Sequence, residues 1–126
     1  MKKTISTEMA PAAIGTYSQA VETQGRLVFM SGQIPLDPVS MELVSDDVAE
    51  QTEQVFRNLA AVAAAAGGTL DDLAKLTVFL TDLSDFGTVN EVMARHVNEP
   101  YPARAAVGIS ELPRGASVEI EGILVL

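Results

Sequence analysis

Two charged residues in the last quarter of the chain have side chains that could bind and hydrolyse a small organic acid. Arg104 stands among alanines in the segment Ala103-Arg104-Ala105-Ala106, and its planar guanidinium matches a carboxylate through two parallel hydrogen bonds. Glu119 could position or activate a water molecule if partial burial raised the pKa of its carboxyl group toward neutrality. Together the two residues offer an anion-binding group and a candidate base.

Both residues also have an ordinary structural interpretation. Arg104 could form a salt bridge with Glu119 or Glu121 that ties neighbouring strands together. Glu119 could equally be an exposed carboxylate on a strand, which is the commoner situation for a glutamate. The residue types alone leave these alternatives open.

Three residues of the N-terminal third could complete a polar pocket. Tyr17 and Ser31 carry hydroxyl groups that can hydrogen-bond a ligand, and Gly32 would let backbone N–H groups approach it closely. Taken singly, each is more often an ordinary strand or turn residue.

The sequence predicts neither a metal site nor a cofactor. Its single histidine, His96, follows Arg95 at the end of a helical pattern, where a cation suits the helix terminus, so we assign it no role. Cysteine is absent, and no HExxH-like or calcium-loop spacing occurs. Gly67-Gly68 lies in neither a GxGxxG nor a Walker pattern and is interpreted as a helix stop.

The composition is typical of one globular domain. The 126 residues fit a single domain over 1–126, and hydrophobic residues make up 48% of them. No apolar signal segment follows the first residues, and the longest apolar run, at 59–66, is far too short to span a bilayer. We therefore expect a cytoplasmic protein without membrane contact. The net charge of -9 opposes binding to nucleic-acid phosphates.

Hydrophobic periodicity predicts an α+β fold with the element order ββαβαββ and two helices on one face of the sheet. The expected elements are strands at 17–22 and 26–34 joined as a hairpin, helices at 46–66 and 84–97, and strands at 73–81, 103–109 and 118–126.

Alternation along the last two strands predicts which side chains share a face. Val118, Ile120 and Leu124 lie on one face of the final strand and Glu119 on the other. Because two helices cover one face only, we expect Arg104 and Glu119 together on the uncovered face. A charged pair among small and apolar residues is poorly suited to open solvent, so we infer a homo-oligomer with sites at its interfaces.

Four segments occur in an order and spacing that resemble the RidA (YjgF-like) family of reactive intermediate deaminases. They are IGTYSQA at 14–20, SGQIP at 31–35, PARAAV at 102–107, and LP at 112–113 followed by VEIE at 118–121. The resemblance runs from near the N-terminus to the final strand.

The resemblance implies a chorismate-mutase-like fold and a homotrimer with a barrel-like core and clefts between subunits. By family analogy Arg104 binds the substrate carboxylate and Glu119 positions the hydrolytic water. Tyr17, Ser31 and Gly32 correspond to further pocket residues, and Asn90 resembles a pocket-associated asparagine.

The implied activity is hydrolysis of 2-imino and enamine acids, such as 2-iminobutanoate and 2-iminopropanoate, to 2-oxo acids and ammonia. The resemblance implies no cofactor, because the imine is already electrophilic. Several bacterial members carry cysteine where this chain has Ala106, which argues against a redox role here.

Two other functions stay open at this point. One is a non-catalytic module that senses a small 2-oxo or carboxylic acid through Arg104. The other is an interaction protein with chaperone-like or nuclease-like behaviour, which the acidic charge and the missing cysteine weaken.

Overall fold

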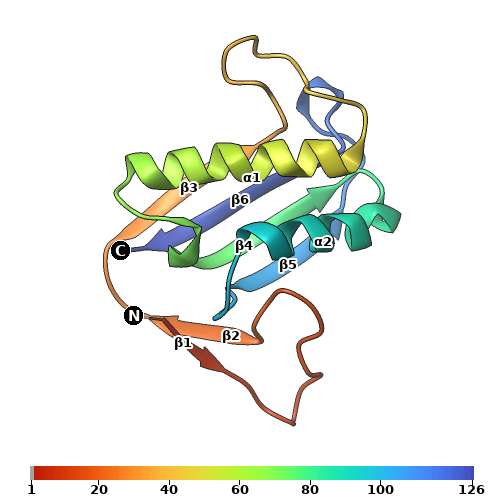
Figure 1. The fold of residues 1–126 in the computed structure, drawn as a ribbon. Helices are drawn as coiled ribbons and strands as arrows, with labels where there is room; N and C mark the ends of the chain where they lie inside the picture. Colours follow the sequence, from red (N-terminus) through yellow and green to blue (C-terminus); the bar gives the residue numbers. More distant parts are fainter. Residues whose placement is uncertain (1) are drawn as a thin grey trace.

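Two helices lie on one face of a four-stranded sheet, and a smaller two-stranded sheet lies beside it (Figure 1). The computed structural model describes residues 2–126. In chain order the elements are β1 (Lys2–Ile5), β2 (Ala20–Thr23), β3 (Leu27–Gln33), α1 (Val48–Ala65), β4 (Leu73–Leu80), α2 (Phe86–His96), β5 (Ala103–Gly108) and β6 (Val118–Val125). The prediction of an α+β fold with two helices on a mixed sheet is confirmed.

The larger sheet has the strand order β3-β6-β4-β5. β6 pairs antiparallel with both β3 and β4, whereas β4 and β5 run parallel. This order makes β3 and β5 the two edge strands and separates β5 from β6 by one strand.

The predicted hairpin between the first two predicted strands is wrong. β2 pairs with β1, a strand that the sequence patterns did not predict, and β3 pairs with β6. Arg26 and Leu126 exchange two backbone hydrogen bonds of 2.8 and 2.9 Å directly after the turn at Gly25. Because these bonds attach the chain to the end of β6, β3 joins the larger sheet while β2 stays in the smaller one.

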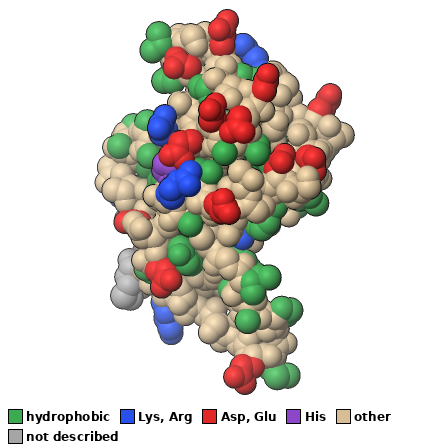
Figure 2. Space-filling view, turned by 45° about the vertical axis from the view of Figure 1, so that its right-hand side comes forward, with side chains coloured by type: hydrophobic (Ala, Val, Ile, Leu, Met, Phe, Trp, Pro, Cys, Tyr) green, Lys and Arg blue, Asp and Glu red, His purple; other side chains and the backbone are tan. Residues whose placement is uncertain are grey.

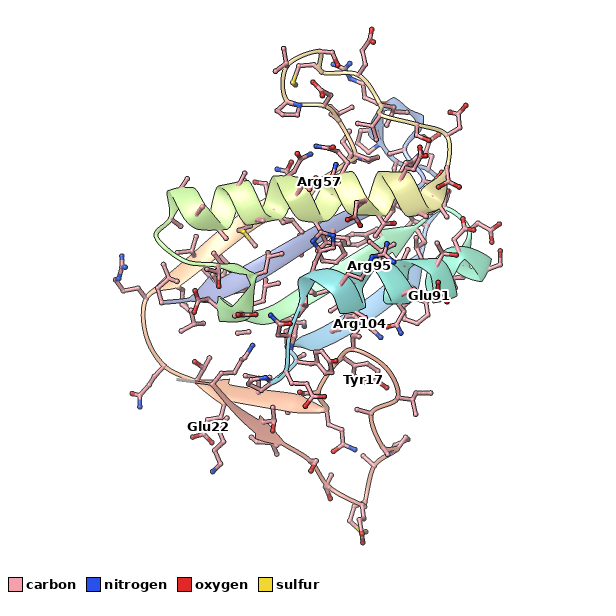
Figure 3. All side chains as sticks on the ribbon, in the orientation of Figure 1. Tyr17, Glu22, Arg57, Glu91, Arg95 and Arg104 are labelled. Atoms are coloured by element: carbon pink, nitrogen blue, oxygen red, sulfur yellow. The ribbon has the colours of Figure 1, made fainter. Side chains whose placement is uncertain are left out.

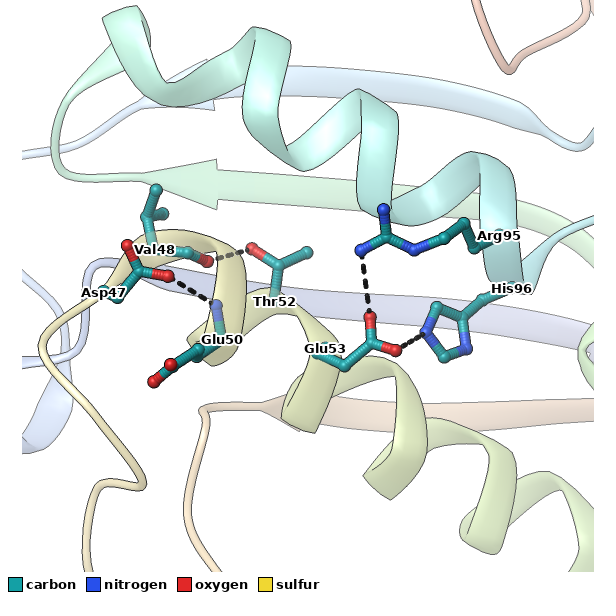
Figure 4. A network of polar contacts seen from close by, with 7 residues as sticks. All are labelled: Asp47, Val48, Glu50, Thr52, Glu53, Arg95 and His96. Carbon is teal, nitrogen blue, oxygen red and sulfur yellow. Dashed lines mark hydrogen bonds and ion pairs between the residues drawn. The ribbon is translucent and has the colours of Figure 1, made fainter.

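Helix α1 is confirmed, with ends slightly inside the predicted 46–66. Asp47 is its N-cap and accepts a hydrogen bond of 3.0 Å from the backbone N–H of Glu50 (Figure 4). Gly67, at φ +92, ends the helix, and the backbone N–H of Gly68 donates to the Ala63 carbonyl at 2.9 Å. The glycine pair is therefore a helix stop, as predicted.

The core lies between the two helices and the sheet. Its fully buried side chains come from α1, α2, β4 and β6, among them Phe56, Leu59, Met93, Leu76, Leu80, Ile120 and Leu124. His96, the last residue of α2, stacks on the Phe56 ring with a centroid distance of 5.3 Å. Its Nε2 lies 2.9 Å from Oε1 of Glu53 on α1, so this contact fastens the helices to each other (Figure 4).

The opposite face of the sheet is not covered by helices and is largely apolar. Phe29 is 72% exposed there, and Leu27 and Val107 are also exposed. The register pairs Glu119 with Phe79 and Phe79 with Val107, so these residues share this face. We call it the open face.

Acidic side chains are spread over the surface that Figure 2 shows, with lysine and arginine side chains between some of them. No helix within residues 2–126 combines the length and apolar character that a membrane crossing needs.

Candidate functional site

Arg104 lies on β5, beneath helix α2 and next to the N-terminal segment. In the register of the sheet it pairs with Leu76, which is buried under the helices. Its guanidinium carbon lies 4.7 Å from the centroid of the Tyr17 ring (Figure 3). The centroid of the Phe86 ring is 4.9 Å from the same carbon. Aromatic faces attract a guanidinium electrostatically, so both rings help to hold the cation in place.

One nitrogen of the guanidinium is fixed by hydrogen bonds. Nη1 of Arg104 donates to Oγ1 of Thr16 at 2.8 Å and to Oδ1 of Asn90 at 2.8 Å. The Thr16 hydroxyl donates in turn to Oδ1 of Asn90 at 2.9 Å. We call Arg104, Thr16, Asn90, Tyr17 and Phe86 the arginine cluster.

The charge of Arg104 has no carboxylate partner within residues 2–126. The ion pairs in this part of the chain join Glu53 to Arg95 and to His96. Partial burial lowers the pKa of Arg104, and the nearby Tyr17 opposes that shift, but an arginine remains charged at neutral pH. The predicted alternative of a salt bridge to Glu119 or Glu121 is therefore wrong, and the cluster presents an uncompensated cation.

Glu119 lies on the open face of β6, beside β3. A Cβ atom placed on Gly32 would overlap the Glu119 carboxylate, with the carboxyl carbon only 2.8 Å away. Ser31 precedes Gly32 on β3 and is exposed. Glycine at position 32 thus makes room for the carboxylate, and the structure brings Gly32 and Glu119 together. We call Ser31, Gly32 and Glu119 the glutamate region.

The expectation that Arg104 and Glu119 share the uncovered face is wrong. Arg104 contacts residues of α2 and pairs with buried Leu76, whereas Glu119 pairs with Phe79 on the open face. Besides Arg104, β5 holds alanines, a glycine and Val107. Its one bulky apolar side chain, Val107, lies exposed on the open face, so the alternation of this strand could not show which side the helices cover. Within one chain, the two charged residues therefore lie on opposite faces of the sheet.

A hollow of about 590 Å³ lies within the N-terminal segment, lined by residues from Thr4 to Gln19. Tyr17 contributes to its wall, but Arg104 and Glu119 do not. Within residues 2–126 no group of three or more His, Cys, Asp or Glu side chains is placed to hold a metal ion.

Sequence reasoning missed two members of the arginine cluster. Thr16 makes contacts with Asn90 and Arg104 across 74 and 88 positions of the chain, and no local pattern could predict such distant partners. Phe86 falls inside the helix predicted at 84–97 but was not predicted as a site residue. Its position four residues before Asn90 on the same helix face was the available signal.

Comparison with known proteins gives matches along nearly the whole chain. The family model described as "Endoribonuclease L-PSP" matches residues 7–126. Protein DfrA of Myxococcus xanthus is 52% identical over 125 residues, which cover 98% of this chain and 95% of that protein. The 2-iminobutanoate/2-iminopropanoate deaminase of Mus musculus is 48% identical over 125 residues, covering 99% of this chain and 92% of the mouse protein.

Among solved structures, RidA from an Antarctic Psychrobacter species superposes with a TM-score of 0.78. It is 54% identical in sequence, and the match covers 98% of this chain and 99% of that one. The predicted resemblance is therefore confirmed, and the chain belongs to the endoribonuclease L-PSP family, the group also called RidA or YjgF-like.

Proposed function

We propose that the protein hydrolyses 2-imino acids, such as 2-iminobutanoate and 2-iminopropanoate, to 2-oxo acids and ammonia. The observation that carries this proposal is the partly buried Arg104 guanidinium, which two rings and two hydrogen bonds hold without any carboxylate partner in residues 2–126. A cation kept in this state is suited to bind an anionic ligand. The activity for which the mouse relative is named supplies the chemical class of that ligand.

In the proposed reaction Arg104 binds the substrate carboxylate and Glu119 positions a water molecule toward C2. The water adds to the C=N carbon and gives a tetrahedral amino alcohol, while Glu119 accepts a proton from the water and passes it to nitrogen. Loss of ammonia then leaves the C=O bond of the 2-oxo acid. Holding water and imine in the reacting geometry is the main contribution we assign to the protein.

The proposed site is formed between copies of the chain. Arg104 and Glu119 lie on opposite faces of one sheet, so they can meet around one substrate only if different subunits supply them. The exposed apolar residues of the open face, among them Leu27, Phe29 and Val107, support its burial against another copy. We propose a homotrimer, in which the open faces form the barrel-like core.

The remaining pocket residues have different parts in this proposal. Tyr17 covers the Arg104 guanidinium, and Ser31 with Gly32 would face the substrate from the neighbouring copy, beside Glu119. Asn90, which sequence comparison suggested as a pocket residue, acts on Arg104 directly through its Oδ1.

The first test measures 2-oxobutanoate formation from imine that a threonine dehydratase generates in the presence of semicarbazide as a trap. We expect the intact protein to outcompete the trap, and Arg104→Ala to lower kcat/KM by about 100-fold or more, as expected for removal of one partner of a charged pair. Arg57→Ala, which changes an exposed arginine of α1, is the matched control and should keep full activity (Figure 3).

If the intact protein does not compete with the trap, the deaminase proposal is wrong. Titration with 2-oxobutanoate then tests the alternative of a non-catalytic sensor of small 2-oxo acids, for which binding without turnover is expected. The family description also names an endoribonuclease, but the net charge of -9 opposes contact with a phosphate backbone, so nucleic acid has no place in the proposal.

A further inference from the structure

We infer that Thr16 is a positioning residue, which fixes the Arg104 guanidinium and determines which of its edges receives the substrate carboxylate. The inference rests on the proposed function, because it assumes that Arg104 binds a carboxylate. It adds a residue and a binding geometry that the family comparison does not supply.

The burial of Thr16 sets it apart from its neighbours. Residues 7–15 are all exposed, whereas Thr16 is only 6% exposed. A hydroxyl group buried at the end of an exposed segment needs hydrogen-bond partners, because an unpaired buried polar group is costly. Thr16 finds both of its partners on other elements, Asn90 on α2 and Arg104 on β5.

The hydrogen bonds of Thr16 have a defined direction. Its hydroxyl carries one proton, which it donates to Oδ1 of Asn90 at 2.9 Å. A lone pair of the same oxygen accepts from Nη1 of Arg104 at 2.8 Å. Since Asn90 Oδ1 also accepts from Nη1, the two N–H bonds of that nitrogen are matched by two oxygen acceptors, and Sδ of Met93 on α2 lies 3.5 Å from the same nitrogen.

This pairing leaves one edge of the guanidinium for a ligand. Nε and Nη2 have no hydrogen-bond acceptor among residues 2–126, while Nη1 is occupied. The Tyr17 and Phe86 rings lie against the guanidinium and hinder approach from their sides. A carboxylate would therefore bind in the plane of the guanidinium, with one oxygen on Nε and the other on Nη2.

Gly15 keeps the approach to this edge open. Its backbone has φ +109, and a Cβ atom there would lie 3.6 Å from Nη2 of Arg104 and 3.2 Å from Oδ1 of Asn90. A longer side chain would extend into this space beside Nη2. The pair Gly15-Thr16 thus supplies the hydroxyl that holds one side of the guanidinium and leaves room at the other.

A purely structural role for Thr16 makes different predictions. If Thr16 only fastened the N-terminal segment to α2, loss of its hydroxyl would lower thermal stability and leave substrate affinity unchanged. If it positions Arg104, loss of the hydroxyl weakens binding of the carboxylate, and the hydroxyl of serine restores it.

The test compares the intact protein with Thr16→Val, which preserves shape and removes the hydroxyl, and with Thr16→Ser, which keeps it. We measure kcat and KM for imine hydrolysis, and the Kd for 2-oxobutanoate as a probe that needs no turnover. For Thr16→Val we expect KM and Kd to rise roughly ten-fold, as for loss of a hydrogen bond to a charged group, with kcat within about three-fold. Thr16→Ser should stay within about two-fold of the intact protein.

A Thr16→Val protein with unchanged KM and Kd overturns the inference, as does a Thr16→Ser protein that is as impaired as Thr16→Val. A readout on the intact protein does not depend on the variants folding. The Nε–H resonance of Arg104 in an ¹⁵N-labelled sample should shift when 2-oxobutanoate is added, and a silent Nε–H under saturating ligand contradicts the predicted edge.

These readouts separate the two proposals. If the intact protein binds 2-oxobutanoate but does not hydrolyse imine, the deaminase function is wrong, and the Kd values still decide the role of Thr16. If the intact protein hydrolyses imine and Thr16→Val behaves identically, the role of Thr16 alone is wrong. A protein that neither binds nor hydrolyses overturns both.

Discussion

The arginine cluster and the glutamate region differ in how much of their environment one chain provides. Arg104 is surrounded by its own chain, with two rings against the guanidinium and two acceptors on Nη1. Glu119 stands on the open face with Gly32 beside it, on a surface where Phe29 is 72% exposed. In the proposed oligomer, the anion-binding half is thus complete within a subunit, whereas the half that positions water is completed by a neighbour.

This difference predicts that changes in the two regions affect different kinetic constants. Residues of the arginine cluster should act mainly on substrate affinity, because they hold the carboxylate in the ground state as well as in the transition state. Glu119 should act mainly on kcat, because its contribution is made when water adds to the imine.

The largest effect on kcat is expected in the glutamate region. Glu119→Gln keeps the size of the side chain but removes the base, so we expect kcat for imine hydrolysis to fall by about 100-fold, with KM within about three-fold. Glu91→Gln, on the exposed face of α2, is the control for loss of one negative charge and should be fully active. An equal fall for both variants, or a main effect of Glu119→Gln on KM, would contradict the comparison.

A smaller effect is expected when a negative charge is introduced next to Arg104 inside the arginine cluster. Asn90→Asp is nearly isosteric and places a carboxylate where Oδ1 now accepts from Nη1 of Arg104 at 2.8 Å. The new ion pair should compete with the substrate carboxylate, so we expect KM to rise by roughly ten-fold. The melting temperature should stay level or increase, which shows that the loss is not caused by unfolding. Unchanged KM would show that the charge of Arg104 is not used for binding.

The smallest effect is expected outside both regions, at the contact between the helices. His96, and then Arg95, hold the pKa of Glu53 below its usual value despite the opposing effect of burial. A carboxyl group with a lowered pKa in the folded state stabilises the fold at pH values above its unfolded pKa, and this contribution is lost as the pH falls through the folded pKa. The loss should therefore appear below about pH 4.5, the ordinary value for a glutamate.

Urea unfolding at several pH values checks this prediction. Glu53→Gln should reduce the loss of stability below pH 4.5 by less than about 1 kcal/mol, since the group is partly exposed. At neutral pH its kcat and KM should match those of the intact protein. A change in KM at neutral pH would mean that the helix contact also influences the arginine cluster.

Local patterns predicted both α-helices and the strands of the larger sheet well, because periodicity depends on neighbouring residues, but they missed β1. Helix α1 and the Gly67-Gly68 stop are found where expected, and so is the alternation of β6, with Val118, Ile120 and Leu124 buried. Strand pairing depends on distant partners instead. β3 lies against β6, about 90 positions further along the chain, so the turn before β3 could not show that the hairpin was wrong.

The candidate site was predictable in its residue types but not in its geometry. The resemblance supplied Arg104, Glu119 and the other candidate residues by their motifs, and their roles stay predictions. The side of β5 that faces α2 could not be predicted, because the bulky apolar residue of this strand, Val107, lies on the open face. No local sequence pattern indicated Thr16 as a site residue, because its hydroxyl forms its hydrogen bonds with residues 90 and 104, which only the fold brings beside it.

The most direct test of a site shared between chains is subunit complementation. Arg104→Ala and Glu119→Gln proteins each keep about 1% or less of the intact kcat/KM in the proposal. An Arg104→Ala chain still supplies Glu119, and a Glu119→Gln chain still supplies Arg104. The two proteins are unfolded together, refolded as an equal mixture and assayed for imine hydrolysis, with each variant refolded alone as the control. If neighbouring subunits supply the two residues, random mixing makes about one quarter of the sites intact, and roughly that share of the intact activity should return. A mixture no more active than its components, once mixed oligomers are shown to form, would contradict the account.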